Sequence, residues 1–468
     1  MHSLPDRIAE ARRILHHAYG YADFRPLQRR VVQSVLAGRD TLAVLPTGGG
    51  KSICFQVPGV VLGGLTVVIS PLVALMQDQV SGLERRGLVA RTLNSLQAEA
   101  EQAETMALLA SGTLRFLYVS PERAPRLGEQ LQQLGVRPRL LAIDEAHCIS
   151  EWGHDFRPAF RRLALFRDLV GRPPTVALTG SATPEVRDDI VHVLGLTKPD
   201  LHQGSFDRPN LWFGVEPIRA PRDRLPLLYQ LLAARPGLAI VYAGTRNATD
   251  ALAQRLWFAG HKAAAYHAGL TRERRSDVLE RFVGGELDVV VATSAFGMGI
   301  DAPRVRLVVH WGMPPTPESY YQEAGRAGRD GQAARCLLFH HPDDATIHQR
   351  QLEVTFPARE VVEALWQDPS LRRRHPAGVV ASVDRLAAEL GPDPGDAAWE
   401  RVRERRKRAV LRLAVMQRYA EDRSCRRQRL VGYFGEADPP ACSGCDACER
   451  PSAPGGSWRS RLARLVGR

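Results

Sequence analysis

Short apolar runs rich in β-branched and aromatic residues alternate with helix-forming stretches through residues 1–342 of this 468-residue chain. Short apolar runs bounded by polar or turn residues are typical of strands that are buried on both faces of a sheet. Helical periodicity lies between them, as in residues 98–110. Strands that alternate with helices predict an α/β fold with a doubly wound parallel sheet. The first series of predicted strands is Leu42–Pro46, Leu65–Ser70, Phe116–Ser120, Leu140–Asp144 and Thr175–Thr179.

A second series of strands follows a break at Phe206–Asn210, where the sequence Phe-Asp-Arg-Pro-Asn interrupts the alternation. Aspartate, proline and asparagine favour turns over regular elements, so this break predicts a domain boundary. We therefore predict two tandem α/β domains, residues 1–205 and 206–342, with a cleft between them. The predicted strands of the second domain are Leu238–Tyr242, Asp288–Ala292, Val305–His310 and Cys336–Phe339.

From Asp343 onward the strand pattern stops and the chain has helical character. Residues 343–450 are predicted to form a helical module that closes with four cysteines and contains a small helical insertion at 356–390. Arg372–Pro376 interrupts that insertion, which fits a helix-turn-helix unit and a plain structural insertion equally well. We expect a long basic helix over Ala397–Asp422, and a Pro/Gly-rich linker with a basic tail over 451–468.

A glycine-rich loop follows the first predicted strand directly, and its sequence is Thr47-Gly48-Gly49-Gly50-Lys51-Ser52. Glycines let backbone N–H groups curl around phosphate oxygens, the lysine can reach the β- and γ-phosphates, and the serine hydroxyl can ligate Mg²⁺. The strict pattern has a further glycine where this chain has Leu45. A glycine-rich turn with an incidental lysine would give the same loop sequence.

A pair of acidic residues decides between these interpretations. The apolar run Leu140–Ile143 ends in Asp144 and Glu145. Ligands of open α/β sheets bind beyond the carboxyl ends of the strands, so these carboxylates are expected beside the glycine-rich loop. We assign Asp144 to Mg²⁺ and Glu145 to the orientation of an attacking water. ATP and Mg²⁺ are therefore the predicted ligands of this site.

The seven cysteines fall into two groups. Cys54, Cys148 and Cys336 are isolated among apolar residues and are expected to be buried thiols. The other four lie close together near the end of the chain, where a cluster without a secretion signal favours metal binding over disulfides. Four thiolates at this spacing suit structural Zn²⁺, while the Cys-x₂-Cys-x₂-Cys run also suits a [4Fe–4S] cluster. The predicted metal ligands are Cys425, Cys442, Cys445 and Cys448.

The net charge of +12 favours a polyanionic partner, although a GC-rich genome would also explain the excess of arginine over lysine. Residues 401–429 hold 12 Lys and Arg against three acids, a net charge of +9. A solvated helix face is the alternative explanation of this stretch. The apolar runs are too short to cross a bilayer, and the first residues lack a signal-peptide core. We predict a bacterial cytoplasmic, nucleoid-associated protein that has no membrane partner.

Several ordered motifs resemble those of superfamily 2 helicases, and more closely those of the RecQ family, over roughly residues 15–450. The motifs of the second half include Tyr321-Gln-Glu-Ala-Gly-Arg-Ala-Gly-Arg-Asp330. The resemblance implies two RecA-like domains followed by a zinc-binding module, and it favours zinc over an iron–sulfur cluster. The motifs of the first half are Phe24-Arg-Pro-Leu-Gln28, the Gly-Lys-Ser loop, Ser70-Pro-Leu-Val-Ala-Leu75, Asp144-Glu-Ala-His147 and Leu178-Thr-Gly-Ser-Ala-Thr183; those of the second are completed by Ala265-Tyr-His-Ala-Gly269 and Ala292-Thr-Ser-Ala-Phe-Gly-Met-Gly-Ile-Asp301.

The resemblance also implies roles for single residues. Gln28 would recognise the adenine edge, with Tyr21 and Arg25 on either side of the base. Arg326 and Arg329 would reach the γ-phosphate as arginine fingers. The state of the ATP site would be relayed to nucleic acid by three further residues, which are His147, Ser181 and Thr183.

The sequence Ser150-Glu-Trp-Gly-His-Asp-Phe-Arg-Pro158 is the most RecQ-specific of these motifs. Aromatic residues interleaved with arginine and histidine suit an exposed loop that stacks on unpaired bases. Core packing is the usual alternative for aromatic residues, but the neighbouring charges make a core strand unfavourable. The predicted nucleic-acid ligands in this loop are Trp152, His154, Phe156 and Arg157.

The resemblance implies an ATP- and Mg²⁺-dependent DNA helicase that moves 3′ to 5′ along single-stranded DNA and opens tailed duplexes, with a role in repair and recombination. Fuller RecQ proteins continue into a winged-helix domain, whereas twenty residues follow Cys448 here. That departure keeps open an ATP-driven translocase or annealing protein with weak unwinding. An RNA helicase is a further alternative, because the Asp-Glu-Ala-His box occurs there too.

Overall fold

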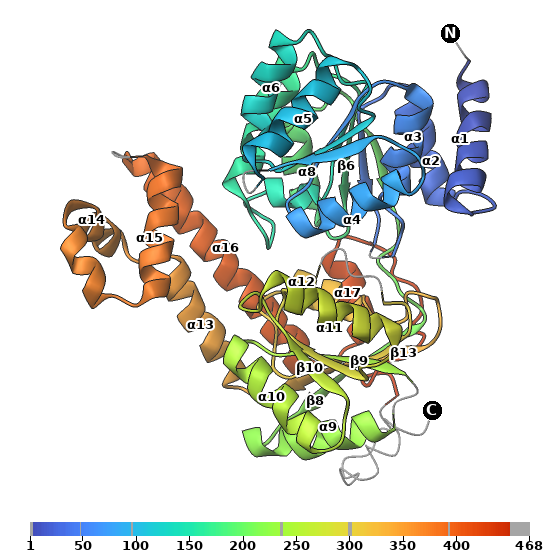
Figure 1. The fold of residues 1–468 in the computed structure, drawn as a ribbon. Coiled ribbons are helices and arrows are strands. Elements are labelled where there is room, and N and C mark those ends of the chain that lie inside the picture. The colour runs from blue at the N-terminus through green and yellow to red at the C-terminus, as the bar shows by residue number, and fades with distance from the viewer. Residues whose placement is uncertain are drawn as a thin grey trace. The chain divides into compact units, whose positions relative to one another are not determined.

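The computed structural model describes residues 3–46, 48–94, 97–234, 237–297, 302–391 and 394–449. Thr47, residues 298–301 of the predicted second-half motif and the predicted tail 451–468 lie outside the described residues. The chain divides into two compact units (Figure 1). Among the described residues, the first unit holds those up to 206 with 434–436, and the second holds those of 207–433 with 437–449.

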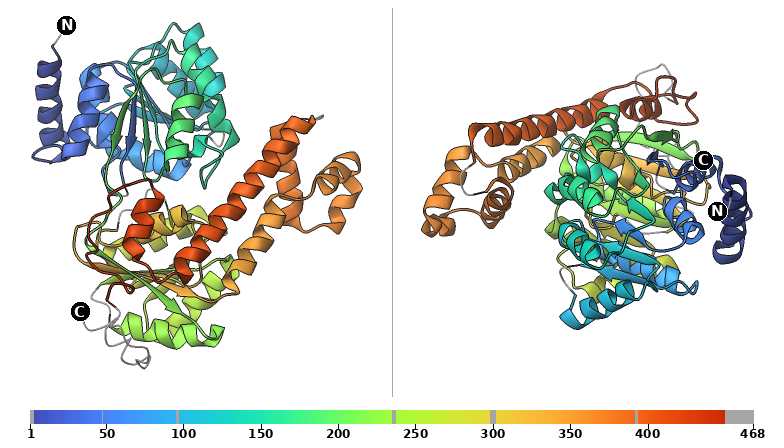
Figure 2. Two further views of the ribbon diagram at one scale, coloured as in Figure 1. Left: turned by 180° about the vertical axis from the view of Figure 1, so that it is seen from behind. Right: turned by 90° about the horizontal axis from the view of Figure 1, so that it is seen from above.

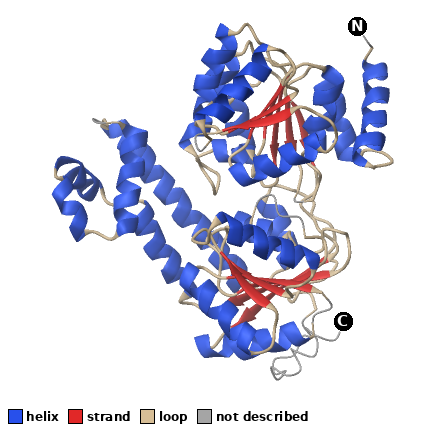
Figure 3. Ribbon diagram, in the orientation of Figure 1, coloured by secondary structure: helices blue, strands red, loops and turns tan. Residues whose placement is uncertain are grey.

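The described strands of the first unit form one parallel sheet in the order β3-β4-β2-β5-β6-β1-β7, and helices flank it (Figure 3). The inner strands are buried along their whole length, as their continuous apolar runs require. The strands are β1 (Thr41–Val44), β2 (Thr66–Ile69), β3 (Ala90–Leu93), β4 (Phe116–Val119), β5 (Leu140–Ile143), β6 (Thr175–Thr179) and β7 (Asp200–Gln203).

The helices of the first unit precede the first strand or connect successive strands of the sheet. α1 begins with a capping box between Ser3 and Asp6 and ends at Gly20 in the left-handed conformation. The helices are α1 (Leu4–Tyr19), α2 (Pro26–Leu36), α3 (Ile53–Leu62), α4 (Val73–Glu84), α5 (Glu99–Ala110), α6 (Ala124–Gln133), α7 (Leu163–Leu169) and α8 (Pro184–Val193), with 3₁₀ turns η1 (Ala146–Ile149) and η2 (Pro158–Arg162).

The second unit contains a parallel sheet in the order β10-β11-β9-β12-β13-β8. Alternate residues of the inner strands β9 and β11 enter two separate cores, as the two-residue period of a strand dictates. In β9, Ile240 and Tyr242 enter one core, whereas Ala239 and Val241 enter the other. The strands are β8 (Leu211–Pro217), β9 (Leu238–Tyr242), β10 (Ala263–Tyr266), β11 (Val289–Ala292), β12 (Val305–His310) and β13 (Ala334–His340).

The long helix α16 joins two cores of the second unit, and Figure 2 shows its length. Its C-terminal half places Met416 and Tyr419 in a core of the sheet, while Trp399 and Val402 of its N-terminal half pack against α14 and α15. The helices of this unit are α9 (Arg224–Ala233), α10 (Arg246–Phe258), α11 (Arg272–Gly284), α12 (Pro317–Ala324), α13 (Asp344–Thr355), α14 (Arg359–Gln367), α15 (Ala377–Leu390), α16 (Asp396–Glu421) and α17 (Arg426–Tyr433), with 3₁₀ turns η3 (Pro221–Asp223) and η4 (Pro369–Arg374).

The predicted fold class is confirmed: two parallel α/β sheets are followed by a helical region with a four-cysteine cluster. Every predicted strand is present, but the sequence did not predict β3, β7, β8 or β10. The expected long basic helix is α16. Among the residues that the structure describes, no helix is long and apolar enough to cross a membrane.

Candidate active site and metal centre

The glycine-rich loop lies between the end of β1 and the start of α3. Gly50 has φ +73°, and a Cβ at this position would lie 2.3 Å from Gln28 Nε2. Only glycine fits there without displacing Gln28. The loop therefore approaches α2 closely, and it leads directly into Lys51 and Ser52.

Lys51 pairs with Glu145 beyond the carboxyl end of β5. The two side-chain atoms, Lys51 Nζ and Glu145 Oε1, lie 2.5 Å apart. Glu145 is buried and has φ +48° and ψ +46°, a left-handed conformation that costs a non-glycine residue free energy. Burial, followed by the charge of Glu145, raises the pKa of Asp144 to about 6, against the opposing charge of Lys51. The structure thus brings Lys51, Asp144 and Glu145 together.

His147 connects this site to the Ser-Ala-Thr segment. His147 Nδ1 lies 3.0 Å from Thr179 Oγ1, which accepts a hydrogen bond of 3.2 Å from the Ser181 backbone N–H. Thr183 is the residue before α8, on the same connection. Burial, followed by the neighbouring His154, holds the pKa of His147 well below its usual value of 6.5. The fully buried imidazole is therefore neutral at physiological pH.

The residues predicted to bind adenine surround the start of the loop. Gln28 Nε2 donates to the carbonyl oxygen of Gly49 at 3.0 Å, and its Oε1 accepts from the Arg25 backbone N–H at 3.0 Å. Arg25 Nη1 donates to the carbonyl oxygen of Gly48 at 2.6 Å. Tyr21 is 54% exposed. Arg25 and Gln28 are thus bonded to the loop, and Tyr21 presents its ring to solvent.

The aromatic-rich segment follows η1 and is only partly exposed. Trp152 is 44% exposed, and His154 stacks on His147 with the ring centroids 4.8 Å apart. Arg157 Nη1 donates to the carbonyl oxygen of Pro71 at 2.8 Å, which ties the segment to the loop after β2. Phe156 is half-buried. Trp152 is therefore the aromatic side chain of this segment that is most available to stack on a base.

The two predicted finger arginines follow α12 in the second unit. Arg326 is buried and donates to the carbonyl oxygen of Gly297 through Nη1. Arg329 is half-buried, and Gly328 between them has φ +54°. We call residues 325–329 the finger loop.

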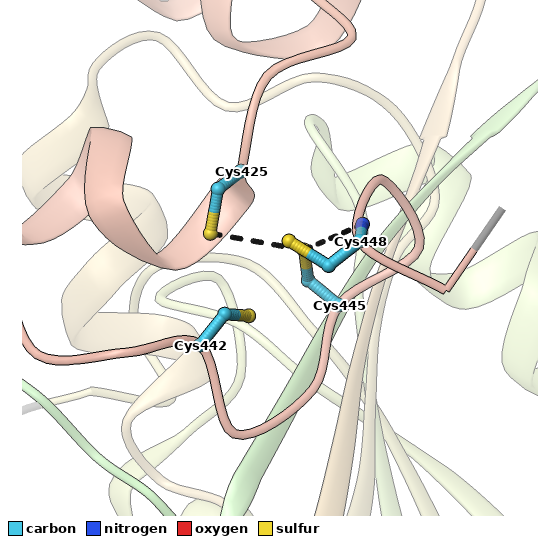
Figure 4. A group of neighbouring side chains, drawn as sticks. All are labelled: Cys425, Cys442, Cys445 and Cys448. Carbon is cyan, nitrogen blue, oxygen red and sulfur yellow. Dashed lines mark hydrogen bonds between the residues drawn. The ribbon is translucent and has the colours of Figure 1, made fainter.

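The four predicted metal ligands meet in one cluster, which Figure 4 shows. Their sulfur atoms all lie within 4.8 Å of one another, a spacing that suits four thiolates around one tetrahedral Zn²⁺ ion. Cys425 precedes α17, and the other three ligands come from the segment 442–448. The three remaining thiols, those of Cys54, Cys148 and Cys336, are buried as predicted.

Three family models match consecutive parts of the chain. The DEAD/DEAH box helicase model matches residues 25–190, and the helicase conserved C-terminal domain matches residues 223–331. The RecQ zinc-binding model matches residues 385–449 and includes all four cysteines. The probable ATP-dependent DNA helicase RecS of Bacillus subtilis is 35% identical over 96% of this chain and 97% of its own length. The chain belongs to the RecQ family.

Other RecQ-family relatives are longer than this chain. ATP-dependent DNA helicase RecQ of Pasteurella multocida is 37% identical over 94% of this chain and 62% of its own length. The chain thus spans less than two thirds of that relative. Among solved structures, Saccharomyces cerevisiae Dbp5 bound to RNA and ADP BeF3 matches 74% of this chain with a TM-score of 0.58 at 16% identity, which concerns the fold alone.

RecQ membership and the cysteine geometry assign Zn²⁺ to the four-cysteine cluster, and the helicase models assign ATP with Mg²⁺ to the glycine-rich loop. A hydroxyl from Ser52 and a carboxylate from Asp144 are the hard oxygen donors that Mg²⁺ prefers. Sequence reasoning did not find the residues that hold the finger loop, because nothing local marks them; Arg208 and Asn210 appeared only as a domain break.

Proposed function

We propose that this RecQ-family chain is an ATP-dependent DNA helicase that moves 3′ to 5′ along single-stranded DNA and separates tailed duplexes. The observation that carries the proposal is the pairing of Lys51 with Glu145 beside Asp144, at the carboxyl end of β5. A lysine of a phosphate loop, a metal-binding acid and a water-orienting acid are the parts that nucleotide hydrolysis needs from one domain.

In this proposal Lys51 would hold the β- and γ-phosphates of ATP, and Ser52 and Asp144 would hold Mg²⁺. Mg²⁺ when bound supplies positive charge to the phosphate oxygens. As Lys51 turns to the phosphates, the Glu145 carboxylate becomes available to accept a hydrogen bond from the attacking water. Gln28, Arg25 and Tyr21 select the adenine base, and the backbone of Gly48–Gly50, with Thr47, surrounds the phosphates.

Arg326 and Arg329 act as arginine fingers in this proposal. Guanidinium groups stabilise the charge that spreads over the γ-phosphoryl oxygens in the transition state. Both residues belong to a short turn after α12, so the position of that turn sets the position of their side chains. Motion of the second domain would in this way be coupled to hydrolysis.

DNA contact is proposed for the aromatic-rich segment, with Trp152 stacking on an unpaired base and His154, Phe156 and Arg157 supporting it. The stacked pair of His147 and His154 supports this assignment, because it joins the segment to the ATP site. The polarity follows the resemblance to the family. We further propose a role in DNA repair and recombination in the bacterial cytoplasm, at the nucleoid.

Steady-state ATP hydrolysis with and without nucleic acid tests this proposal. We expect single-stranded DNA to stimulate hydrolysis strongly, RNA of the same sequence to stimulate it weakly, and Lys51→Ala to abolish it. Equal stimulation by RNA would favour an RNA helicase, and no stimulation by DNA would overturn the proposal. Sensitivity of a deletion strain to DNA damage would test the cellular role.

A further inference from the structure

The side chain of Arg208, which precedes β8, holds the finger loop by hydrogen bonds to its main chain. Arg208 Nη1 donates to the carbonyl oxygen of Gly325 at 3.1 Å. Its Nη2 donates to the carbonyl oxygens of Ala327 and Gly328 at 3.0 and 3.1 Å. One planar guanidinium therefore fixes three carbonyl groups around Arg326.

Asn210 holds the other side of the same loop. Its Nδ2 donates to the carbonyl oxygens of Gly328 and Gln332, both at 2.8 Å. A Cβ on Gly328 would lie 2.5 Å from Asn210 Nδ2, so the turn and this amide fit closely together. The main chain on both sides of Arg329 is thereby fixed.

Arg427 in turn holds the segment that carries Arg208 and Asn210. It lies two residues after Cys425, is 1% exposed, and donates to the Asp207 carboxylate. It also donates to the carbonyl oxygens of Arg208 at 2.8 Å and Leu211 at 2.6 Å. Burying a charged guanidinium costs desolvation free energy, which the carboxylate and the two carbonyl oxygens offset. These bonds fix the position of the Arg427 side chain.

The cysteine-bearing segment makes two further bonds to the same stretch. Ser443 Oγ donates to the carbonyl oxygen of Pro209 at 2.8 Å, and the Asp446 backbone N–H donates to the carbonyl oxygen of Phe213 at 3.0 Å. A continuous set of hydrogen bonds therefore leads from the metal-binding segment through residues 207–213 to the finger loop, all within the second unit.

From these contacts we propose that Arg208, Asn210 and Arg427 are positioning residues for ATP hydrolysis, which fix the finger loop so that Arg326 and Arg329 meet the transition state. The inference rests on the proposed function. Stabilisation of developing charge requires donors that are already in place, and a displacement of about 1 Å costs about a hundredfold in rate. Ground-state binding of ATP depends on the glycine-rich loop and is not affected.

Arg208→Lys in the full chain tests the role. Lysine keeps the charge but cannot donate to three carbonyl groups from a planar fork. We expect kcat for DNA-stimulated ATP hydrolysis to fall by about tenfold or more. The KM for ATP and the affinity for ADP should stay within about twofold, while the affinity for ADP with aluminium fluoride, which mimics the transition state, should fall as kcat does.

Arg224→Ala is the matched control. Arg224 is a buried arginine of the second unit, whereas Arg208 is half-buried; Arg224 pairs with Asp344 at 2.5 Å, without a contact to the finger loop among the bonds described. We expect this variant to lower the melting temperature without changing kcat per folded molecule. An equal loss of kcat in Arg224→Ala, or an unchanged kcat in Arg208→Lys, would overturn the positioning role.

Two further comparisons separate this inference from the proposed function. If Arg326→Ala and Arg329→Ala abolish hydrolysis and Arg208→Lys does not reduce it, the positioning role fails and the finger assignment stands. If neither finger variant reduces hydrolysis, the finger assignment and the positioning role both fail. Arg427→Lys should reduce kcat in the same direction with its zinc content intact, and the double variant with Arg208→Lys should be no worse than the more impaired single variant. Losses that multiply in the double variant would contradict a shared route.

Discussion

At the scale of single residues, Glu145 combines burial, a left-handed backbone and an ion pair with Lys51. The ion pair alone would respond to bound phosphate, because phosphate would be a second anionic partner for Lys51. In the proposed reaction cycle, the carboxylate would lose this partner when Lys51 binds phosphate. This arrangement is the physical basis of the proposed hydrolysis.

Glu145→Gln should separate nucleotide binding from hydrolysis. The amide keeps the size of the side chain but cannot orient water as a carboxylate does, so we expect kcat to fall by about 10²- to 10⁴-fold. ATP affinity should be retained or increased, because Lys51 no longer has a competing anion. Fluorescent ATP binding and steady-state hydrolysis measure the two effects. Near-normal kcat in the Glu145→Gln protein would exclude Glu145 from the chemistry.

His147 predicts a pH dependence of stability in the first unit. Its pKa is lowered in the folded state, chiefly by burial, from the usual 6.5. The unfolded chain therefore binds a proton below pH 6.5 that the folded chain excludes, so stability falls as pH decreases, by at most about 1.4 kcal/mol per pH unit.

The melting temperature measured at about pH 7.5 and again at about pH 5.5 tests this loss of stability. It should be smaller in His147→Gln than in the natural chain. The exposed His192 supplies a control on the same unit, and His192→Gln should keep the natural pH dependence. An identical slope in all three proteins would show that His147 does not titrate differently on unfolding.

Residues with strong local context could be predicted from the sequence, and residues that act at a distance could not. Lys51 and Asp144 each follow an apolar strand, so their common location follows from parallel topology. Arg427 lies among other arginines of a basic stretch, and no local pattern distinguishes the fully buried guanidinium from its neighbours. The ion pair between Lys51 and Glu145 likewise became evident only from the three-dimensional structure.

At the scale of elements, the metal-binding segment should stabilise the second unit. Cys445 is fully buried and forms an isolated parallel β-bridge with Phe213 of β8. Cys445→Ser should lose bound zinc and lower the melting temperature, because structural zinc contributes directly to folding free energy. Cys336→Ser, which alters a buried thiol outside the cluster, should keep its zinc. Full zinc content in Cys445→Ser would contradict the proposed ligand set.

The aromatic-rich segment should contribute to single-strand affinity through Trp152. A stacked base contributes about 1–3 kcal/mol, so Trp152→Ala should weaken binding to single-stranded DNA by about tenfold or more. Trp257 on α10 is 55% exposed and serves as the matched control. Fluorescence anisotropy with a labelled oligonucleotide measures both variants. Equal affinities for the Trp152→Ala and Trp257→Ala proteins would remove Trp152 from the DNA site.

The four strands that the sequence did not predict are the four edges of the two sheets, namely β3, β7, β8 and β10. An edge strand has one neighbour and needs no continuous apolar run. β7 has the sequence Asp-Leu-His-Gln, and β10 has Ala-Ala-Ala-Tyr without a β-branched residue. The inner strands were predictable because burial on both faces demands apolar side chains. The edge strands are determined by the neighbouring strand with which each pairs in the folded sheet, which the local sequence does not show.

At the scale of the whole molecule, the proposed activity depends on residues of both units. Lys51, Asp144 and Glu145 belong to the first unit, whereas Arg326 and Arg329 belong to the second. Each unit has its own hydrophobic core. A motor that couples hydrolysis to movement requires such a division.

Displacement of a labelled strand from a DNA duplex with a 3′ single-stranded tail tests the central claim most directly. Lys51→Ala serves as the inactive control, and duplexes with a 5′ tail or made of RNA are measured in parallel. We predict ATP-dependent displacement that is confined to the 3′-tailed DNA and absent from the Lys51→Ala protein. DNA-stimulated ATP hydrolysis without displacement would contradict the helicase function and leave an ATP-driven translocase or remodelling protein.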